Sequence, residues 1–369
     1  MEQTFLTNIK INKVRHLNNI SIPLDKKRRK HLILTGKNGS GKTSVLDAAE
    51  KYIQSFLGEN ELKRLDSGVT FDFTSNAMLQ EKYQNGNFIF AYYKAERELQ
   101  VEKYKNIEKV EFQDKYSIAE NPGIKFTKYL VDLKATQAFT KEYEKAEKID
   151  NWFHAFEDIL KKIFEDKNLQ LKFNEETFQF SICETGKAPF DFNTMSSGYA
   201  AIFEIINDLI IRMEAKSGLR TEFDMEGIVL VDEIETHLHL ELQKKILPIL
   251  TALFPNIQFI ITTHSPFILS SLDNTVIYDL QNRTLVENGL ENLPYEGIVE
   301  GYFKSDTLSA ELREKFEKYK SLVSKGELSD EEYQEIDKLE FYLDEIPDYL
   351  AKELAAEYSR LKLEFSNRG

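Results

Sequence analysis

Apolar and polar residues alternate along the first 35 positions of the chain in the manner of short β-strands. The apolar positions of this stretch, which we expect to be buried, are Phe5, Ile9, Ile11, Val14, Leu17, Ile20, Ile22 and Leu24. Three later segments, 88–93, 228–231 and 259–262, have the composition of further strands. Because the last two are almost entirely apolar, we expect them to be covered on both faces, which predicts a mostly parallel sheet with crossover helices.

Helical periodicity follows in the middle of the chain. Two amphipathic helices are indicated by apolar stripes, the first made by Phe126, Leu130 and Leu133, and the second by Ile149, Trp152, Phe153, Phe156, Ile159 and Ile163. Residues 169–192 then have the pattern of a hairpin, with its turn at Glu184-Thr185-Gly186. We therefore expect a helical and hairpin insertion at about 98–192.

The chain becomes helical and acidic beyond Pro294. Gly326 closes one predicted helix, Ser329 and Glu332 form a capping box for the next, and Pro347 suits the first turn of a third. This pattern predicts an N-terminal head over residues 1–305 and an acidic helical appendage over residues 306–369. The appendage could equally be a docking surface for a partner or a cover for the edge of the sheet.

The most informative motif is the stretch 36–43, which reads Gly-Lys-Asn-Gly-Ser-Gly-Lys-Thr and fills every position of a phosphate-binding loop. An apolar strand enters it and a helix leaves it, so its amide groups and the helix dipole would face an anion. We expect Lys42 to reach the β- and γ-phosphates and Thr43 to ligate Mg²⁺. The predicted nucleotide-binding residues of this loop are Gly36, Asn38, Gly39, Ser40, Gly41, Lys42, Thr43 and Ser44.

Two further candidates for catalysis stand at the ends of the later strands. The apolar run 228–231 delivers Asp232 and Glu233 at its carboxyl end, where α/β sheets bind ligands. Asp232 would hold Mg²⁺, and Glu233 would orient the water that attacks the γ-phosphate. His264, which follows the next strand, could form a hydrogen bond with the γ-phosphate or with that water. Residues 195–199 add a loop of small residues at a helix start, a weak anion site when taken alone.

Composition and charge restrict the class of protein. The chain has 369 residues, of which 41% are hydrophobic and 30% charged, as in a soluble globular protein. The absence of a long apolar run and of a basic, apolar leader predicts a cytoplasmic protein without a membrane association. A single cysteine, Cys183, excludes an internal disulfide. The net charge of −14 opposes indiscriminate binding of nucleic acid, although the basic stretch 26–30 could be either a solvated turn or a contact to nucleotide or DNA.

Four motifs follow one another along the chain, namely the phosphate loop at 36–43, the small-residue loop at 195–199, the pair Asp232-Glu233, and His264. In this order they resemble the motifs of the ATP-binding-cassette ATPases. The resemblance implies a P-loop α/β head with an N-terminal antiparallel lobe, and it makes 195–199 a variant of the signature motif and His264 the switch histidine. In that family two heads enclose two ATP molecules, so Ser196, Ser197 and Gly198 would act on the nucleotide of the partner head. The implied cofactors are ATP and Mg²⁺, and the implied assembly is a homodimer, with higher assemblies left open.

The runs 232–239 and 263–266 look most similar to the RecF-like and SMC-like heads, and among them to the soluble bacterial ATPases grouped as AAA family, 21-type and 15-type. Relatives in that group include the overcoming-lysogenization-defect nucleases and the ATPases of Septu anti-phage systems. The resemblance implies an ATPase that couples hydrolysis to a protein effector in anti-phage defence. The insertion is too short for the long coiled coil of chromosome-organising relatives, and no second acidic metal cluster indicates a nuclease.

Three alternatives remain open at this stage. The chain could be an ATP-gated DNA-binding factor of repair or recombination, as the RecF-like resemblance and the basic stretch 26–30 suggest. His237 and His239 could bind zinc, although we favour a structural or dimer-interface role. No glutamine ends the strand 88–93, where the family has its glutamine loop; Lys94, Glu96 and Arg97 follow instead, and Gln100 is the nearest candidate.

Overall fold

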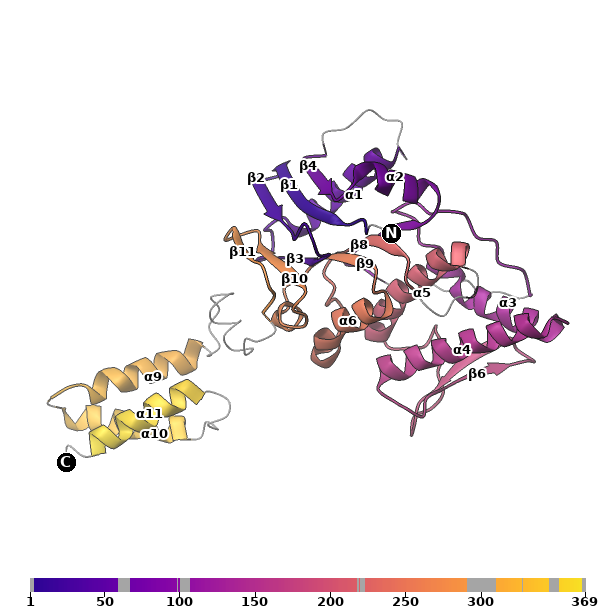
Figure 1. Cartoon of the computed structure of the whole chain (residues 1–369). Coiled ribbons are helices and arrows are strands. Elements are labelled where there is room, and N and C mark those ends of the chain that lie inside the picture. The colour runs from indigo at the N-terminus through magenta and orange to yellow at the C-terminus, as the bar shows by residue number, and fades with distance from the viewer. Residues whose placement is uncertain are drawn as a thin grey trace. The chain divides into compact units, whose positions relative to one another are not determined.

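The computed structural model describes residues 3–58, 67–97, 99, 107–217, 219, 223–290, 310–326, 328–344 and 352–366. Gln100 and Pro347 lie outside these described residues. The chain divides into two compact units, Met1–Tyr295 and Glu296–Gly369, which are described separately (Figure 1). In the described parts, no helix combines the length and the apolar character that a bilayer span requires.

An antiparallel sheet forms the N-terminal lobe of the first unit, as predicted. Its strands are β1 (Leu6–Val14), β2 (Leu17–Pro23) and β4 (Val69–Phe73), in the order β2-β1-β4. The apolar positions of the alternating pattern point inward, because all eight predicted residues from Phe5 to Leu24 are buried. Strand β4 and the helix after it, α2 (Asn76–Gln84), were not predicted from the sequence.

The central sheet is mostly parallel, which confirms the predicted fold class. Its order is β11-β10-β3-β9-β8-β5, and each adjacent pair from β10 to β5 is parallel. Among the described strands of this sheet, only the edge strand β11 pairs antiparallel. The bounds are β3 (His31–Thr35), β5 (Phe88–Tyr93), β8 (Glu226–Val231), β9 (Ile257–Thr262), β10 (Thr275–Asp279) and β11 (Thr284–Val286). The carboxyl ends of the five parallel strands therefore meet at one edge of the sheet.

Helices connect these strands. The bounds are α1 (Lys42–Leu57), α5 (Ser197–Ser217), α6 (Leu240–Leu253) and α7 (Pro266–Leu269). Helix α1 ends at Gly58, whose φ of 75° is the left-handed conformation that a glycine adopts most easily.

In its described residues, the insertion contains a short helix, two longer helices and a hairpin. They are η1 (Pro122–Lys125), α3 (Phe126–Phe139), α4 (Tyr143–Phe164), β6 (Gln170–Asn174) and β7 (Gln179–Cys183). In Figure 1, α3, α4 and β6 lie on the side of the first unit remote from β1 and β2. The predicted turn at Glu184-Thr185-Gly186 is present, since Lys187 N–H donates to the Glu184 carbonyl at 3.2 Å, but it is the second of two turns and the first was not predicted. The chain reverses between Asn174 and Gln179, where the Asn174 side chain accepts two backbone N–H groups, whereas the turn at Glu184 leads from β7 to a bridge at Phe190.

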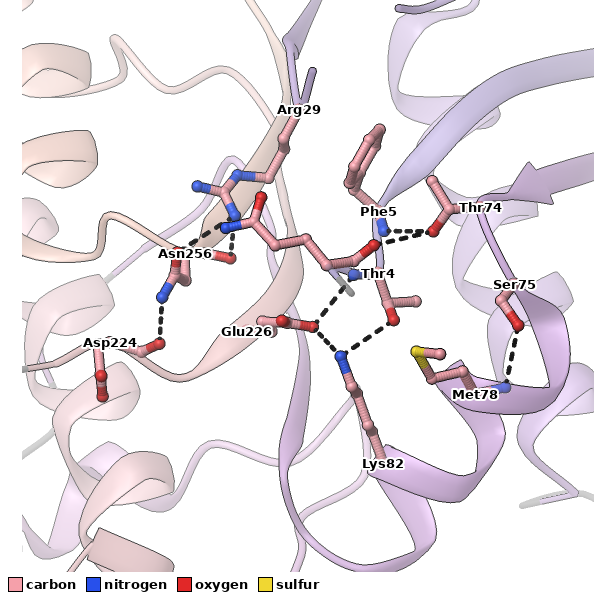
Figure 2. A network of polar contacts seen from close by, with 11 residues as sticks. Thr4, Phe5, Arg29, Thr74, Ser75, Met78, Lys82, Asp224, Glu226 and Asn256 are labelled. Atoms are coloured by element: carbon pink, nitrogen blue, oxygen red, sulfur yellow. Dashed lines mark hydrogen bonds and ion pairs between the residues drawn. The ribbon is translucent and has the colours of Figure 1, made fainter. Parts of the chain in front are cut away.

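Polar contacts join the two sheets near the amino ends of their strands (Figure 2). The ammonium group of Lys82 lies 2.7 Å from a carboxylate oxygen of Glu226 and donates to the Thr4 hydroxyl at 3.2 Å. The same Glu226 oxygen accepts the Thr4 backbone N–H at 3.2 Å. Arg29 donates to the backbone carbonyl of Asn256 at 3.2 Å. This network lies at the edge of the central sheet opposite to the carboxyl ends.

The second unit is helical, with α9 (Ala310–Val323), α10 (Asp330–Asp344) and α11 (Lys352–Ser366). It has its own apolar core, made by Phe316, Tyr319, Leu322, Val323, Ile336, Leu339, Leu343 and Tyr358. The predicted capping box is confirmed, because Glu332 N–H donates to the Ser329 hydroxyl and Ser329 N–H donates to the Glu332 carboxylate.

Candidate nucleotide-binding site

Three motifs that are far apart in the sequence meet at the carboxyl edge of the central sheet. The phosphate loop follows β3, Asp232 and Glu233 follow β8, and His264 stands two residues beyond β9. Strand β9 lies between β3 and β8 in the sheet. The parallel topology therefore brings the three motifs to neighbouring strand ends.

The phosphate loop is shaped around glycine. Gly36 has a φ of 135°, and a Cβ atom there would lie 2.8 Å from the Ser40 hydroxyl oxygen. A side chain at position 36 would therefore clash and would also strain the backbone. The Ser40 hydroxyl is buried and has no hydrogen-bond partner. An unsatisfied buried hydroxyl in a glycine-rich loop fits a site that a polar ligand completes.

Lys42 connects the loop to the histidine. It is 5% exposed, and its Nζ donates to the carbonyl oxygens of Gly36 at 3.0 Å and Lys37 at 3.4 Å. The same Nζ lies 2.6 Å from Nε2 of His264. Because a lysine ammonium can only donate, Nε2 acts as the acceptor and the imidazole is neutral. Burial and the nearby Lys42 both lower the pKa of His264, which stabilises this neutral form.

Thr262 organises the two carboxylates at the end of β8. Its hydroxyl donates to Oδ1 of Asp232 at 2.5 Å and accepts the backbone N–H of Glu233 at 2.7 Å. Asp232 is 2% exposed, whereas Glu233 is half-buried and has a φ of +44°. No role for Thr262 was predicted from the sequence, although its place at the end of β9 beside Asp232 follows once the strand order is known.

Arg97 is a second residue whose role the sequence analysis missed. It is 3% exposed, and its guanidinium group donates to the carbonyl oxygens of Asp232 at 2.6 Å, Glu233 at 2.9 Å and Ile234 at 3.2 Å. The one signal in the sequence is a basic residue four positions beyond the apolar strand 88–93.

The predicted signature residues stand at the start of α5. Ser196 and Ser197 are exposed and Gly198 is buried. A Cβ atom on Gly198 would lie 3.0 Å from the carbonyl oxygen of His237, so this helix start packs closely against the segment that follows Glu233. Tyr199, which stands where the family signature has glutamine, stacks on Phe164 of α4 with 4.2 Å between ring centroids.

Thr43, the other predicted Mg²⁺ ligand, lies exposed in the first turn of α1, as part of the same edge as Asp232. Hydroxyl and carboxylate oxygens are the ligand types that Mg²⁺ prefers. Among the described residues no group of three or more His, Cys, Asp or Glu side chains is placed to hold a metal ion. His237 and His239 therefore belong to no such group there.

A hollow of about 430 Å³ opens beside the phosphate loop. It is lined by the backbone region from Lys37 to Ser40 and by residues from two other segments, namely His16, Leu17, Leu280, Gln281 and Arg283. Its walls therefore combine apolar, amide and cationic groups.

The basic stretch 26–30 lies at the amino end of β3, whereas the phosphate loop follows the carboxyl end of that strand. Five residues of extended chain separate the two by roughly 16 Å. Arg29 and Lys30 make hydrogen bonds within the chain, while Lys26, Lys27 and Arg28 are exposed. This arrangement speaks against a contact of the stretch with nucleotide held in the loop of the same chain.

Comparison with known proteins adds the following similarities. Residues 121–270 match the family described as "AAA domain, putative AbiEii toxin, Type IV TA system". The Septu protein PtuA of Bacillus mycoides (strain KBAB4) is 34% identical over 155 residues, which are 40% of this chain and 21% of that protein. The Retron Ec83 probable ATPase of Escherichia coli is 40% identical over 89 residues, which are 24% of this chain and 16% of that protein. The chain thus spans about a fifth of the length of these relatives.

Among solved structures, the crystal structure of the SmcHead bound to the C-winged helix domain of ScpA covers 79% of this chain and 100% of that chain. The TM-score is 0.43 and the sequence identity is 14%. Residues 121–270 therefore match this AAA family, and parts of the chain are similar in sequence to Septu PtuA and to a retron probable ATPase.

Proposed function

We propose that this chain binds ATP and Mg²⁺ at the carboxyl edge of its parallel sheet, hydrolyses ATP within a homodimer, and passes the result to a protein effector. The observation that carries this proposal is the convergence of the phosphate loop, the Asp232–Glu233 pair and His264 at neighbouring strand ends. The AAA family match and the probable ATPase among the relatives support it.

The chain's own groups account for nucleotide binding. Lys42 is held by the carbonyl oxygens of its own loop, and a phosphate oxygen would be a stronger acceptor for its ammonium group. The Ser40 hydroxyl would gain the partner that it lacks. The hollow beside the loop has room for a base and a ribose.

Hydrolysis would use the groups at the ends of β8 and β9. Thr43 and Asp232 would hold Mg²⁺, which supplies positive charge to the phosphate oxygens. Glu233 would orient the attacking water, and His264, kept neutral by burial and by Lys42, would form a hydrogen bond with the γ-phosphate. Lys42 and His264 are already within hydrogen-bond distance, so both can address one phosphate.

The dimer is supported by the exposed start of α5. Ser196 and Ser197 are exposed at the amino end of a 21-residue helix, where the helix dipole favours an anion. A second head that offers its γ-phosphate there would complete the composite site. The proposed setting, anti-phage defence in the cytoplasm, rests on the resemblance to Septu-type ATPases.

The test combines turnover with mass measured by light scattering. Replacing the carboxylate in Glu233→Gln should lower kcat by about 10²-fold or more while ATP stays bound. This variant should therefore accumulate as a dimer with Mg²⁺ and ATP, at twice the mass of the 43.0 kDa chain. In Glu233→Gln combined with Ser196→Arg, the bulky cation should prevent the dimer.

A mass that rises with ATP and no longer rises in the Ser196→Arg combination would support the composite site. A mass that stays at one chain with ATP bound would refute the dimer, and the loop at 195–199 would then be only a helix start. Absence of turnover in the unaltered protein would refute the ATPase itself.

The DNA-binding alternative is favoured by the exposed side chains of Lys26, Lys27 and Arg28. Filter binding across salt concentrations separates it from the main proposal, because phosphate contacts give a steep dependence on salt. No retention of DNA at low salt with ATP present would exclude it, whereas a steep slope would favour an ATP-gated DNA clamp.

A further inference from the structure

Arg97 reaches from the end of β5 into the backbone that carries the proposed catalytic carboxylate. Strand β5 pairs with β8 up to Tyr93 and Val231, and Asp232 N–H donates to the Tyr93 carbonyl at 2.8 Å. Four residues beyond Tyr93, the Arg97 guanidinium donates to the carbonyl oxygen of its own segment at Lys94, 3.0 Å away, and to three carbonyls beyond β8. The side chain is almost fully buried, and its two terminal nitrogens donate to these backbone carbonyls, whereas its Nε has no hydrogen-bond partner.

The three acceptors beyond β8 belong to consecutive residues. The carbonyls of Asp232, Glu233 and Ile234 all turn toward the same guanidinium, at 2.6, 2.9 and 3.2 Å. Carbonyl dipoles that converge in this way repel one another unless a cation compensates them. Glu233 sits in the middle of this curl with a φ of +44°, a conformation that residues with a side chain rarely adopt.

The other side of Glu233 is held by the neighbouring strand. Thr262, at the end of β9, accepts the Glu233 N–H at 2.7 Å and donates to Asp232 at 2.5 Å. Because β9 and β5 flank β8 on its two sides, the left-handed residue is fixed from both directions. The Glu233 N–H donates to Thr262 at the end of β9, and the Glu233 carbonyl accepts from Arg97 in the segment that follows β5.

We propose that Arg97 is a positioning residue for ATP hydrolysis, which fixes the backbone of Glu233 and thereby the direction of the Glu233 carboxylate. This inference rests on the proposed function, since it requires Glu233 to act in hydrolysis. Arginine suits the position because its planar fork can bond several carbonyls at once, which the single ammonium group of a lysine cannot do in the same geometry.

The first test compares nucleotide binding with turnover in Arg97→Gln and Arg97→Lys. A displacement of a catalytic group by 1 Å can cost about 10²-fold in rate, so we expect kcat to fall by roughly 30-fold to 100-fold. The Kd for ATP should stay within about threefold of the value for the unaltered protein, because no described contact joins Arg97 to Lys42 or to the loop glycines. Should Arg97→Gln fail to fold, Arg97→Lys carries the test.

The second test asks whether Arg97 acts through Glu233. In a double-mutant cycle, Arg97→Gln should lower kcat much less in a Glu233→Gln background than in the unaltered protein, because the group that it positions is already lost. A residue that merely supports the fold would lower kcat by the same factor in both backgrounds.

Lys82→Met is a matched control for loss of a buried cation. Lys82 is also largely buried and pairs with Glu226 in the network of Figure 2, near the amino edge of the same sheet. Its replacement should lower the melting temperature and leave kcat within about threefold, because the network lies away from the reacting groups.

The outcomes separate this inference from the proposed function. Turnover in the unaltered protein together with unchanged kcat in Arg97→Gln would refute the positioning role alone. An equal loss of ATP affinity and kcat, or equal factors in the two backgrounds, would also refute it. No turnover in the unaltered protein would refute the proposed function itself.

Discussion

Individual buried polar side chains determine how the strands of the first unit fit together. Gln258, which is fully buried in β9, accepts the Leu6 N–H at 2.7 Å and donates to the Lys30 carbonyl at 2.7 Å, so one amide joins the lobe to the central sheet. His31, 5% exposed in β3, accepts the Phe259 N–H on Nδ1 at 3.0 Å. A ring nitrogen that accepts must be unprotonated, so the fold requires this histidine to be neutral.

The stability of the protein should therefore depend on pH through His31. Burial, helped by Arg29, lowers the pKa of His31 from 6.5 to about 3. The unfolded chain binds this proton near pH 6.5 and the folded chain does not. The contribution of neutral His31 to the free energy of unfolding is therefore fully present above that pH. It is lost as the pH falls, at about 1.4 kcal/mol per unit. Urea unfolding at pH 7.5 and 5.5 measures the free energy of unfolding. Between these pH values His31→Gln should lose less of it than the unaltered protein, and equal losses would contradict the role of His31.

At the scale of elements, the sequence predicted those elements that depend on residues close together in the chain. The phosphate loop and the capping box at Ser329 each depend on a few neighbouring residues, and the structure contains both elements. Strand β4 was missed because it is short and pairs with β1 across about 60 residues of chain. The turn between Asn174 and Gln179 was missed because it depends on the pairing of β6 with β7, whereas the predicted turn at Glu184 is the later of the two.

In the candidate site, too, the residues of contiguous motifs could be predicted and the contacts between strands could not. The positions of Lys42, Asp232, Glu233 and His264 could be predicted from contiguous motifs, and their catalytic roles remain predictions. Arg97 and Thr262 act across strands, so their contacts appear only once the order β9-β8-β5 is known.

Close packing between η1 and α5 gives a prediction at this scale. A Cβ atom on Gly123 would lie 2.8 Å from the backbone N and Cα of Asp208, and Gly123 N–H donates to the Asp208 carboxylate at 3.1 Å. Because both clashing atoms are helix backbone, Gly123→Ala must push η1 away from α5. We expect a loss of about 1–3 kcal/mol in the free energy of unfolding, the usual range for overpacking. Urea denaturation measures it, with Gly326→Ala as a control, because Gly326 is exposed, has no positive φ and has no atom near an added Cβ. Equal stability of Gly123→Ala and the unaltered protein would contradict the close approach.

At the scale of the whole molecule, the chain consists of two units with separate cores. The second unit buries its own apolar side chains between α9, α10 and α11 and still exposes Phe341 and Leu363, at 71% and 64%. A unit that carries its own core does not need the head for its packing, and the head does not need it to complete either sheet. We propose that residues 306–369 are a docking module for a partner protein, and the alternative is that they cover a sheet edge of the head.

Removal of residues 306–369 should therefore spare the head. A chain that ends at residue 305 should keep the kcat for ATP within about threefold and should unfold cooperatively, because the missing core lies within the second unit. Turnover and thermal unfolding of the shortened chain, beside the full chain at equal concentration, measure both quantities. A docking module would leave turnover intact while the effector is lost from the complex. Aggregation of the shortened chain, or loss of its cooperative transition, would instead show that the appendage covers apolar surface of the head, and the docking role would then be wrong.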